Sequence, residues 1–170
     1  MHLWTNAVRV DPEAFSADYE LGGCSFSSFS ADERTPKAPI YYNRDLNTVA
    51  RLHSEDMRDN DFFSHSSSDG TSFSARVGAW YATSFIGENI AWGYANSEVV
   101  VVQGWMCSTE GHRQNIMSGD WTELGTGAAS ELLHPGLRRR PHHRPRPRRH
   151  GLPHPQTTHR HPRLPRRLAG

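Results

Sequence analysis

A change of composition near residue 134 limits what this chain can fold into. No aromatic residue follows Trp121, and the stretch from His134 to Gly170 contains no Ile, Val, Phe or Met. A segment folds only when burial of apolar surface offsets the loss of chain entropy, and this stretch has almost nothing to bury. We therefore predict one folded domain over residues 1–133, followed by a disordered tail rich in Arg, Pro and His over residues 134–170.

The net charge of +1 at pH 7 hides opposite charges in these two parts. All 18 acidic residues lie between Asp11 and Glu131, whereas 11 of the 19 basic residues lie between Arg138 and Arg167. A basic tail of this kind would bind polyanions in a salt-dependent manner, which is one alternative for function. We expect no sequence-specific recognition of nucleic acid.

The domain mixes helical and extended patterns. The clearest helix is predicted just after Asn43, a suitable N-cap, because apolar positions and one histidine form a single stripe: Leu46, Val49, Ala50, His53 and Met57. Residues 97–107 contain four valines that favour a strand, but the cap signal at Asn96 and the spacing favour a helix, which we expect. Residues 86–94 and 121–129 are predicted to be strands or extended chain. This interleaving predicts an α+β domain.

Four residues of the domain are candidates for chemistry: His65, Glu88, His112 and Glu123. A carboxylate in an apolar segment needs a partner, because burying it unpaired is costly. Two histidines with one or two glutamates could bind zinc, the one cofactor these residues suggest, or could form an acid/base pair. The third interpretation is a hydrogen-bonded structural network around Glu88, which spacing alone favours because no H-E-x-x-H or C-x-x-C signature is present. His53, on its apolar stripe, is predicted to be a satisfied core residue.

The two cysteines, Cys24 and Cys107, permit one disulfide in an oxidising compartment, or two free thiols, and their spacing leaves both open. No apolar run reaches the roughly 18 residues of a membrane-spanning helix. The opening "MHLWTNAVRV" lacks the charged start and apolar stretch of a secretory signal peptide, so no signal is predicted.

Five stretches together resemble a known family. In chain order they are "LHSEDM", "DFFSHSSSDGTSFSARV", "GENIAWGY", "VVVQGWMCSTEGHRQNIM" and "WTELGTG". They are similar to the bacterial SCP-like domains of the CAP superfamily (cysteine-rich secretory proteins, antigen 5 and pathogenesis-related 1 proteins). The resemblance implies a three-layer α-β-α sandwich with a small, mostly antiparallel sheet.

The resemblance also implies a central cleft lined by histidines and glutamates, which can bind zinc in animal members. Carried over by motif, His65 matches the histidine of "FSH", Glu88 the glutamate of "GEN", and His112 the histidine of "GHR". Glu123 matches the glutamate of the "TEIG" segment. The family's other cleft histidine has no counterpart here.

Members of this family share a fold more than a reaction. We expect a binding or interaction module that is secreted or held in the cell envelope, monomeric or weakly oligomeric, with a small molecule, a lipid or a protein as its ligand. The alternative is a hydrolase in which His65 or His112 is the general base and Glu88 orients it. No nucleophile is identified, so the sequence does not establish an enzyme.

The resemblance finally implies a last strand after Ala129 that this chain lacks. Codons that can encode residues 130–138, read with one base dropped, can encode Ala-Ser-Tyr-Tyr-Thr-Gln-Asp-Phe-Gly, the ending typical of the family. We therefore hypothesise that the tail is a frameshift product. Without the last strand, the sheet would have an open edge and part of its core would be uncovered.

Overall fold

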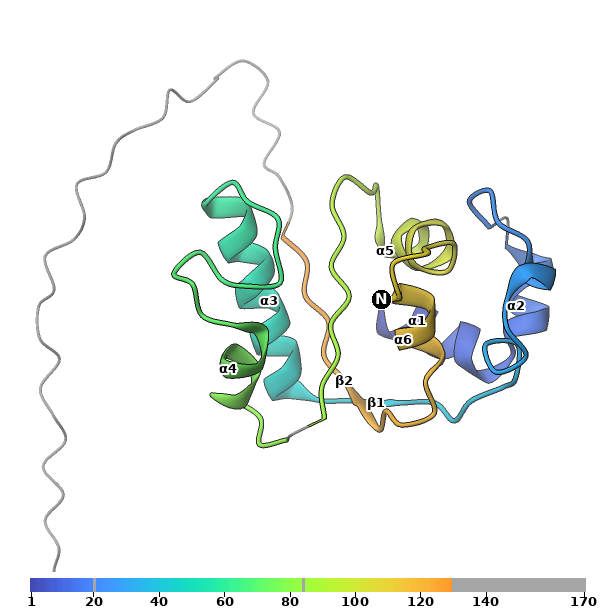
Figure 1. The fold of residues 1–170 in the computed structure, drawn as a ribbon, viewed down its shortest axis with the longest axis horizontal. Coiled ribbons are helices and arrows are strands. Elements are labelled where there is room, and N and C mark those ends of the chain that lie inside the picture. The colour runs from blue at the N-terminus through green and yellow to red at the C-terminus, as the bar shows by residue number, and fades with distance from the viewer. Residues whose placement is uncertain (20, 84, 130–170) are drawn as a thin grey trace, which may run out of the picture. The chain divides into compact units, whose positions relative to one another are not determined.

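The computed structural model describes residues 1–19, 21–83 and 85–129. Within them, helices lie on both sides of a central layer of extended chain (Figure 1). This arrangement confirms the α+β class and the three layers. The predicted tail over residues 134–170, and the frame change proposed for it, lie outside the described residues.

One outer layer is built from the N-terminal helices and two later ones. Its elements are α1 (His2–Val10), α2 (Pro12–Asp18), the 3-10 turn η1 (Phe26–Ser28), α5 (Ser97–Val99) with the π-helical η2 (Val100–Trp105), and α6 (His112–Met117). The helix predicted over residues 97–107 is therefore confirmed. The Asp11 carboxylate begins α2 by accepting from the amide of Ala14 at 2.9 Å.

The hydrophobic core lies in this helical layer. Its buried members are Val8, Phe15, Phe29, Val100, Val101, Val102, Trp105, Met106, Ile116 and Met117. The fully buried Arg9 side chain lies among the same elements, and it donates to the carbonyls of Ala38 at 3.0 Å and Ile116 at 2.6 Å. These hydrogen bonds tie α1 to the end of α6 and to the chain before β1.

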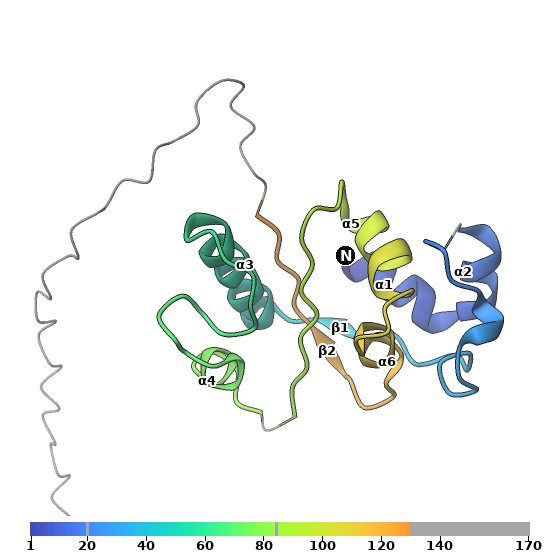
Figure 2. The ribbon, with the colours of Figure 1, turned by 45° about the horizontal axis from the view of Figure 1, so that its top comes forward.

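The opposite layer consists of α3 (Arg44–Asp59) and α4 (Phe73–Gly78) (Figure 2). As predicted, the Asn43 side chain caps α3 by accepting from two backbone amides. Ser72 caps α4 by accepting from the amide of Ala75. His53 is buried in this layer, as expected of a core residue. It is only half satisfied, because Nε2 lies 2.9 Å from the carbonyl of Ser64 while Nδ1 has no partner.

The central layer contains one short ladder. Strands β1 (Tyr41–Tyr42) and β2 (Glu123–Leu124) pair in parallel. The described residues therefore do not show the mostly antiparallel sheet that was expected. Parallel pairing is possible because the intervening helices provide the long crossover that it requires. Of residues 86–94 and 121–129, predicted as strands or extended chain, Glu123 and Leu124 alone join a ladder within the described part of the chain.

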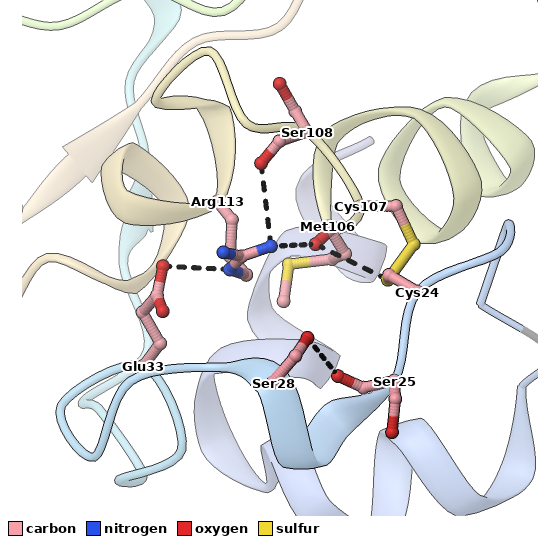
Figure 3. The surroundings of a disulfide bond; sticks show 8 residues. All are labelled: Cys24, Ser25, Ser28, Glu33, Met106, Cys107, Ser108 and Arg113. Carbon is pink, nitrogen blue, oxygen red and sulfur yellow. Dashed lines mark hydrogen bonds and ion pairs between the residues drawn. A yellow bond between two sulfur atoms is a disulfide. The ribbon is translucent and has the colours of Figure 1, made fainter.

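Cys24 and Cys107 form a disulfide, which answers the question left open by their spacing (Figure 3). It joins the loop after α2 to the end of η2, across a sequence separation of 83 residues. Beside it, the Arg113 guanidinium donates to Glu33 at 2.8 Å and to the carbonyl of Met106 at 2.9 Å. The disulfide and this ion pair close the helical layer around its core.

None of the helices in the described residues combines the length and the apolar character needed to cross a bilayer.

Candidate functional site

The site is built around Glu88, which lies in the extended central segment. Its Oε1 lies 2.8 Å from Nδ1 of His65, and its Oε2 accepts from the Arg76 guanidinium at 2.7 Å. Arg76 comes from the short helix α4, and it also donates to the carbonyl of His65 at 2.9 Å. Three segments thus converge on one carboxylate, and both of its oxygens are occupied.

His112 enters the site from the first position of α6. Its Nδ1 lies 2.8 Å from the hydroxyl of Ser108, and its carbonyl accepts from the Asn89 side chain at 3.0 Å. Burial lowers the pKa of His112, electrostatic repulsion by His65 lowers it further, and Glu110 opposes these effects only in part. Because the pKa is lowered, His112 is mainly the neutral imidazole at pH 7.

These residues line one surface cleft of about 270 Å³. Its lining comprises His65, Ile86, Gly87, Glu88, Asn89, Glu110, Gly111, His112, Asn115 and Trp121. The fold therefore brings together three of the four residues singled out in the sequence, although they are up to 47 positions apart. His65 is half exposed and Glu88 is largely covered, so the cleft presents an imidazole in front of a fixed carboxylate.

Glu123 has other partners. Its carboxylate accepts from the Tyr81 hydroxyl and, at 3.1 Å, from the Asn43 amide. These hydrogen bonds, the one from Tyr81 first, lower the pKa of Glu123. Glu123 does not line the cleft described above, and it joins the start of α3 to the segment after α4.

The four predicted zinc ligands do not form one cluster in the described residues. No three His, Cys, Asp or Glu side chains among them lie close enough together to hold a metal ion. Both oxygens of Glu88 are already bound by His65 and Arg76, so zinc would have to displace a guanidinium. We derive no step through a metal.

Sequence reasoning missed Arg76 and the two asparagines of the site. Asn115 donates to Asn89 at 2.8 Å, and the carbonyl of Asn115 accepts from the Trp121 indole at 2.6 Å. The sequence did contain a signal for Arg76. Glu88 lies in an apolar segment and needs a cationic partner, and few Arg or Lys residues lie nearby in the sequence. The asparagine network gave no signal, since its members become neighbours only in the fold.

The three-layer arrangement (Figure 1) and the cleft lined by His65, Glu88 and His112 are the features that the resemblance to the SCP domains implied. The family model "CAP: Cysteine-rich secretory protein family" matches residues 5–131. The chain belongs to this family.

Relatives from bacilli are similar over the same region. The chain is 33% identical over 124 residues to the uncharacterized protein YkwD of Bacillus subtilis (strain 168), covering 72% of this chain and 47% of YkwD. It is 36% identical over 91 residues to the uncharacterized membrane protein YlbC of the same strain, covering 53% of this chain and 26% of YlbC. The chain thus spans less than half the length of these curated relatives.

A solved structure has the same fold. It is the 1.5 Å crystal structure of an extracellular protein containing an SCP domain from Bacillus anthracis str. Ames. The TM-score is 0.52 at 33% identity, and the match covers 56% of this chain and 32% of the other.

Proposed function

We propose that this domain is an extracytoplasmic binding or interaction module, and that its ligand occupies the cleft formed by His65, Glu88 and His112. The observation that carries the proposal is the occupation of both Glu88 oxygens, by His65 at 2.8 Å and Arg76 at 2.7 Å. A carboxylate held in this way orients a neighbouring imidazole and is not free to react. A cleft with a few fixed polar groups is typical of a recognition site.

Two observations support a location outside the cytoplasm. The Cys24–Cys107 disulfide is of a kind that persists in oxidising compartments. The similar solved structure is described as that of an extracellular protein. Thiol titration of the chain taken from its native compartment tests this location. We expect no free thiol before reduction and two afterwards, and two free thiols at the outset would contradict the proposal.

The binding role is tested by following the imidazole NMR signals of His65 and His112. The probes are a short-chain phospholipid, an N-acetylated sugar and a mixture of short peptides, which represent the proposed ligand classes. We expect one of them to shift both signals, and the H65A/H112A double variant to lose its affinity for that probe. The matched control is His2→Ala, which removes an imidazole outside the cleft. If no probe shifts either signal at millimolar concentration, the binding role is wrong.

Zinc in this cleft stays a prediction, which a titration can test. The seven histidines of residues 134–170 will bind some zinc loosely, so the comparison is between the full chain and its H65A and H112A variants. A cleft site predicts that each variant loses the tightest binding step and keeps the weak ones. Equal zinc affinity in all three chains would discard the site.

The hydrolase alternative is favoured by one specific observation. The pKa of His112 is lowered by burial, so a neutral imidazole is available as a general base at pH 7. Turnover of a fluorescent peptide substrate that is lost in H112A and in H65A would support this alternative. Turnover that is absent, or equal in the wild type and both variants, would leave the binding role.

The polyanion alternative depends on residues outside the described part of the chain. Heparin affinity that falls with salt and disappears on deletion of residues 134–170 would support it.

A further inference from the structure

An aromatic ring forms one wall of the cleft that contains His65 and Glu88. Trp121 lines this cleft, and its indole donates to the carbonyl of Asn115 at 2.6 Å. A Cβ added to Gly87 would come 2.9 Å from the Trp121 ring and 2.6 Å from Oδ1 of Asn115. The glycine therefore allows both side chains to pack against the extended central segment, and the indole is held in a fixed orientation.

A pair of exposed aromatic side chains lies on the same two segments as the His65–Glu88 contact. The rings of Phe63 and Trp92 meet edge to face with their centroids 6.5 Å apart, and the two residues are 51% and 48% exposed. Phe63 is two residues from His65, so their Cα atoms are at most about 7 Å apart. Trp92 is four residues from Glu88 in extended chain, so both side chains point to the same side of that segment. The aromatic pair therefore lies next to the cleft.

The groups that line the rest of the cleft are polar, and most of them carry no net charge. Glu88 is bound by Arg76, His112 is mainly neutral, and the two asparagines of the site present side-chain amides. The exception is Glu110, which is exposed. This lining offers several hydrogen bonds of fixed direction but little apolar surface. It suits a ligand covered with hydroxyl or amide groups better than it suits a lipid tail.

Aromatic rings beside fixed polar groups match the chemistry of a sugar. A pyranose ring has a face of C–H groups that packs on an indole or phenyl ring, and a rim of hydroxyl groups that needs donors and acceptors. Residues 1–133 contain 18 acidic residues and 8 Lys or Arg, which disfavours a polyanionic sugar. The combination indicates a neutral sugar.

We propose that the cleft and the Phe63–Trp92 pair form one elongated site for a short neutral oligosaccharide. One sugar ring packs on Trp121 in the cleft, where His65 and the asparagine amides bind its polar substituents. A ring further along the same oligosaccharide packs against Phe63 and Trp92. This proposal rests on the binding function proposed above, and it adds the class of the ligand and a second contact surface outside the cleft.

The experiment titrates two tetrasaccharides into the full chain and measures the heat of binding. The probes are tetraacetylchitotetraose and cellotetraose, which are neutral β-linked sugars of equal length with and without acetamido groups. We expect saturable binding of at least one of them, and the tighter one tells whether the site takes an acetylated or an unacetylated sugar. The corresponding monosaccharide should bind at least about tenfold more weakly, because it reaches only one aromatic surface. Equal affinity for monosaccharide and tetrasaccharide would overturn the elongated site.

Three replacements of Trp92 separate ring packing from loss of apolar area. Trp92→Ala should weaken tetrasaccharide binding about tenfold, the loss typical of truncating one aromatic anchor, and should leave monosaccharide binding unchanged. Trp92→Phe should keep most of the affinity, whereas Trp92→Leu should not, because leucine is apolar but has no flat ring. The matched control is Trp80→Ala, which removes an indole that is 50% exposed and does not line the cleft. Wild-type affinity in Trp92→Ala, or equal affinity in the Leu and Phe variants, would overturn the proposal.

The imidazole NMR signals of His65 and His112 separate failure of this proposal from failure of the binding role. If the phospholipid or the peptides shift both signals while neither tetrasaccharide does, the sugar site is wrong and the binding role stands. If no probe shifts them, both are wrong.

Discussion

The two sides of the central layer differ in how completely they are packed. The helical layer of α1, α2, η2 and α6 holds the buried cluster and is closed by the Cys24–Cys107 disulfide. The α3 and α4 side contributes no residue to that cluster, and Val49, His53 and Met57 of α3 line a hollow of about 340 Å³ that Val100, Trp105 and Ile116 of the helical layer also adjoin. The core of the first side is formed by side chains of that layer's own segments. On the second side, the extended residues 85–91 and 125–129 join no ladder within the described part of the chain.

The candidate site lies where these two sides meet. Glu88 belongs to the extended segment, Arg76 to α4 and His112 to α6. A change in packing on either side should therefore reach the cleft. The variants described below measure how differently the two sides respond.

Removal of the disulfide should have the largest effect, and it acts on the closed side. Replacing Cys24 and Cys107 by serine frees a loop of more than 80 residues in the unfolded chain. The expected loss is about 4 kcal/mol of the free energy of unfolding. Urea unfolding measures it, with reduced wild type as the control. Equal stability of the oxidised chain and the variant would show that helix packing alone closes this side.

Gly125→Ala should have the next largest effect, on the open side. The added methyl group would lie 2.0 Å from the carbonyl carbon of Leu46, so α3 or the extended segment must move. We expect a loss of about 2–3 kcal/mol. Gly119→Ala is the matched control, because no atom lies within 4 Å of its added Cβ. A neutral Gly125→Ala, measured by thermal unfolding, would mean that this segment is not seated on the helix.

A matched pair of valine truncations compares the two sides directly. Val101 is fully buried in η2, whereas Val49, nearly as buried in α3, lines the hollow. Val101→Ala should cost about 2 kcal/mol and Val49→Ala about 1 kcal/mol, because a side chain beside a void has already lost contacts on one side. Urea unfolding of both variants gives the difference. Equal losses would contradict the contrast in packing.

Glu33→Gln should have an effect similar in size to the valine truncations, but with a distinct pH dependence. Burial raises the pKa of Glu33, but hydrogen bonds from Ser30 and Arg113 outweigh it, so the pKa lies below its usual value. The carboxylate therefore stabilises the domain above about pH 4.5, by about 1–2 kcal/mol, and this contribution is lost as pH falls through the lowered pKa.

Urea unfolding at pH 7 and at about pH 3 checks this prediction. Wild type and Glu33→Gln should differ at pH 7 and converge in acid. The control is Glu55→Gln, which breaks the exposed pair with Arg51 and should change little at either pH. A difference that persists unchanged at pH 3 would assign the effect to packing.

Local patterns predicted much of the fold. The cap at Asn43, the stripe of α3 and the helix over residues 97–107 depend on neighbours three or four positions away, so the sequence alone contains the information. The same holds for the α+β class. The pairing of residues 86–94 and 121–129 was not predictable, because a segment joins a ladder only where a second segment lies beside its edge.

Residue type and motif indicated which groups could form the cleft, and His65, Glu88 and His112 do share it. The tertiary structure decided the rest. In the folded domain, Arg76 donates to the second oxygen of Glu88, and Glu123 accepts from Tyr81 and Asn43. Cys24 and Cys107 form a disulfide, and Nδ1 of His53 has no hydrogen-bond partner. Each of these contacts joins segments that are far apart in the chain. Composition, spacing and periodicity describe neighbours along the chain, so they do not predict which distant segments come into contact.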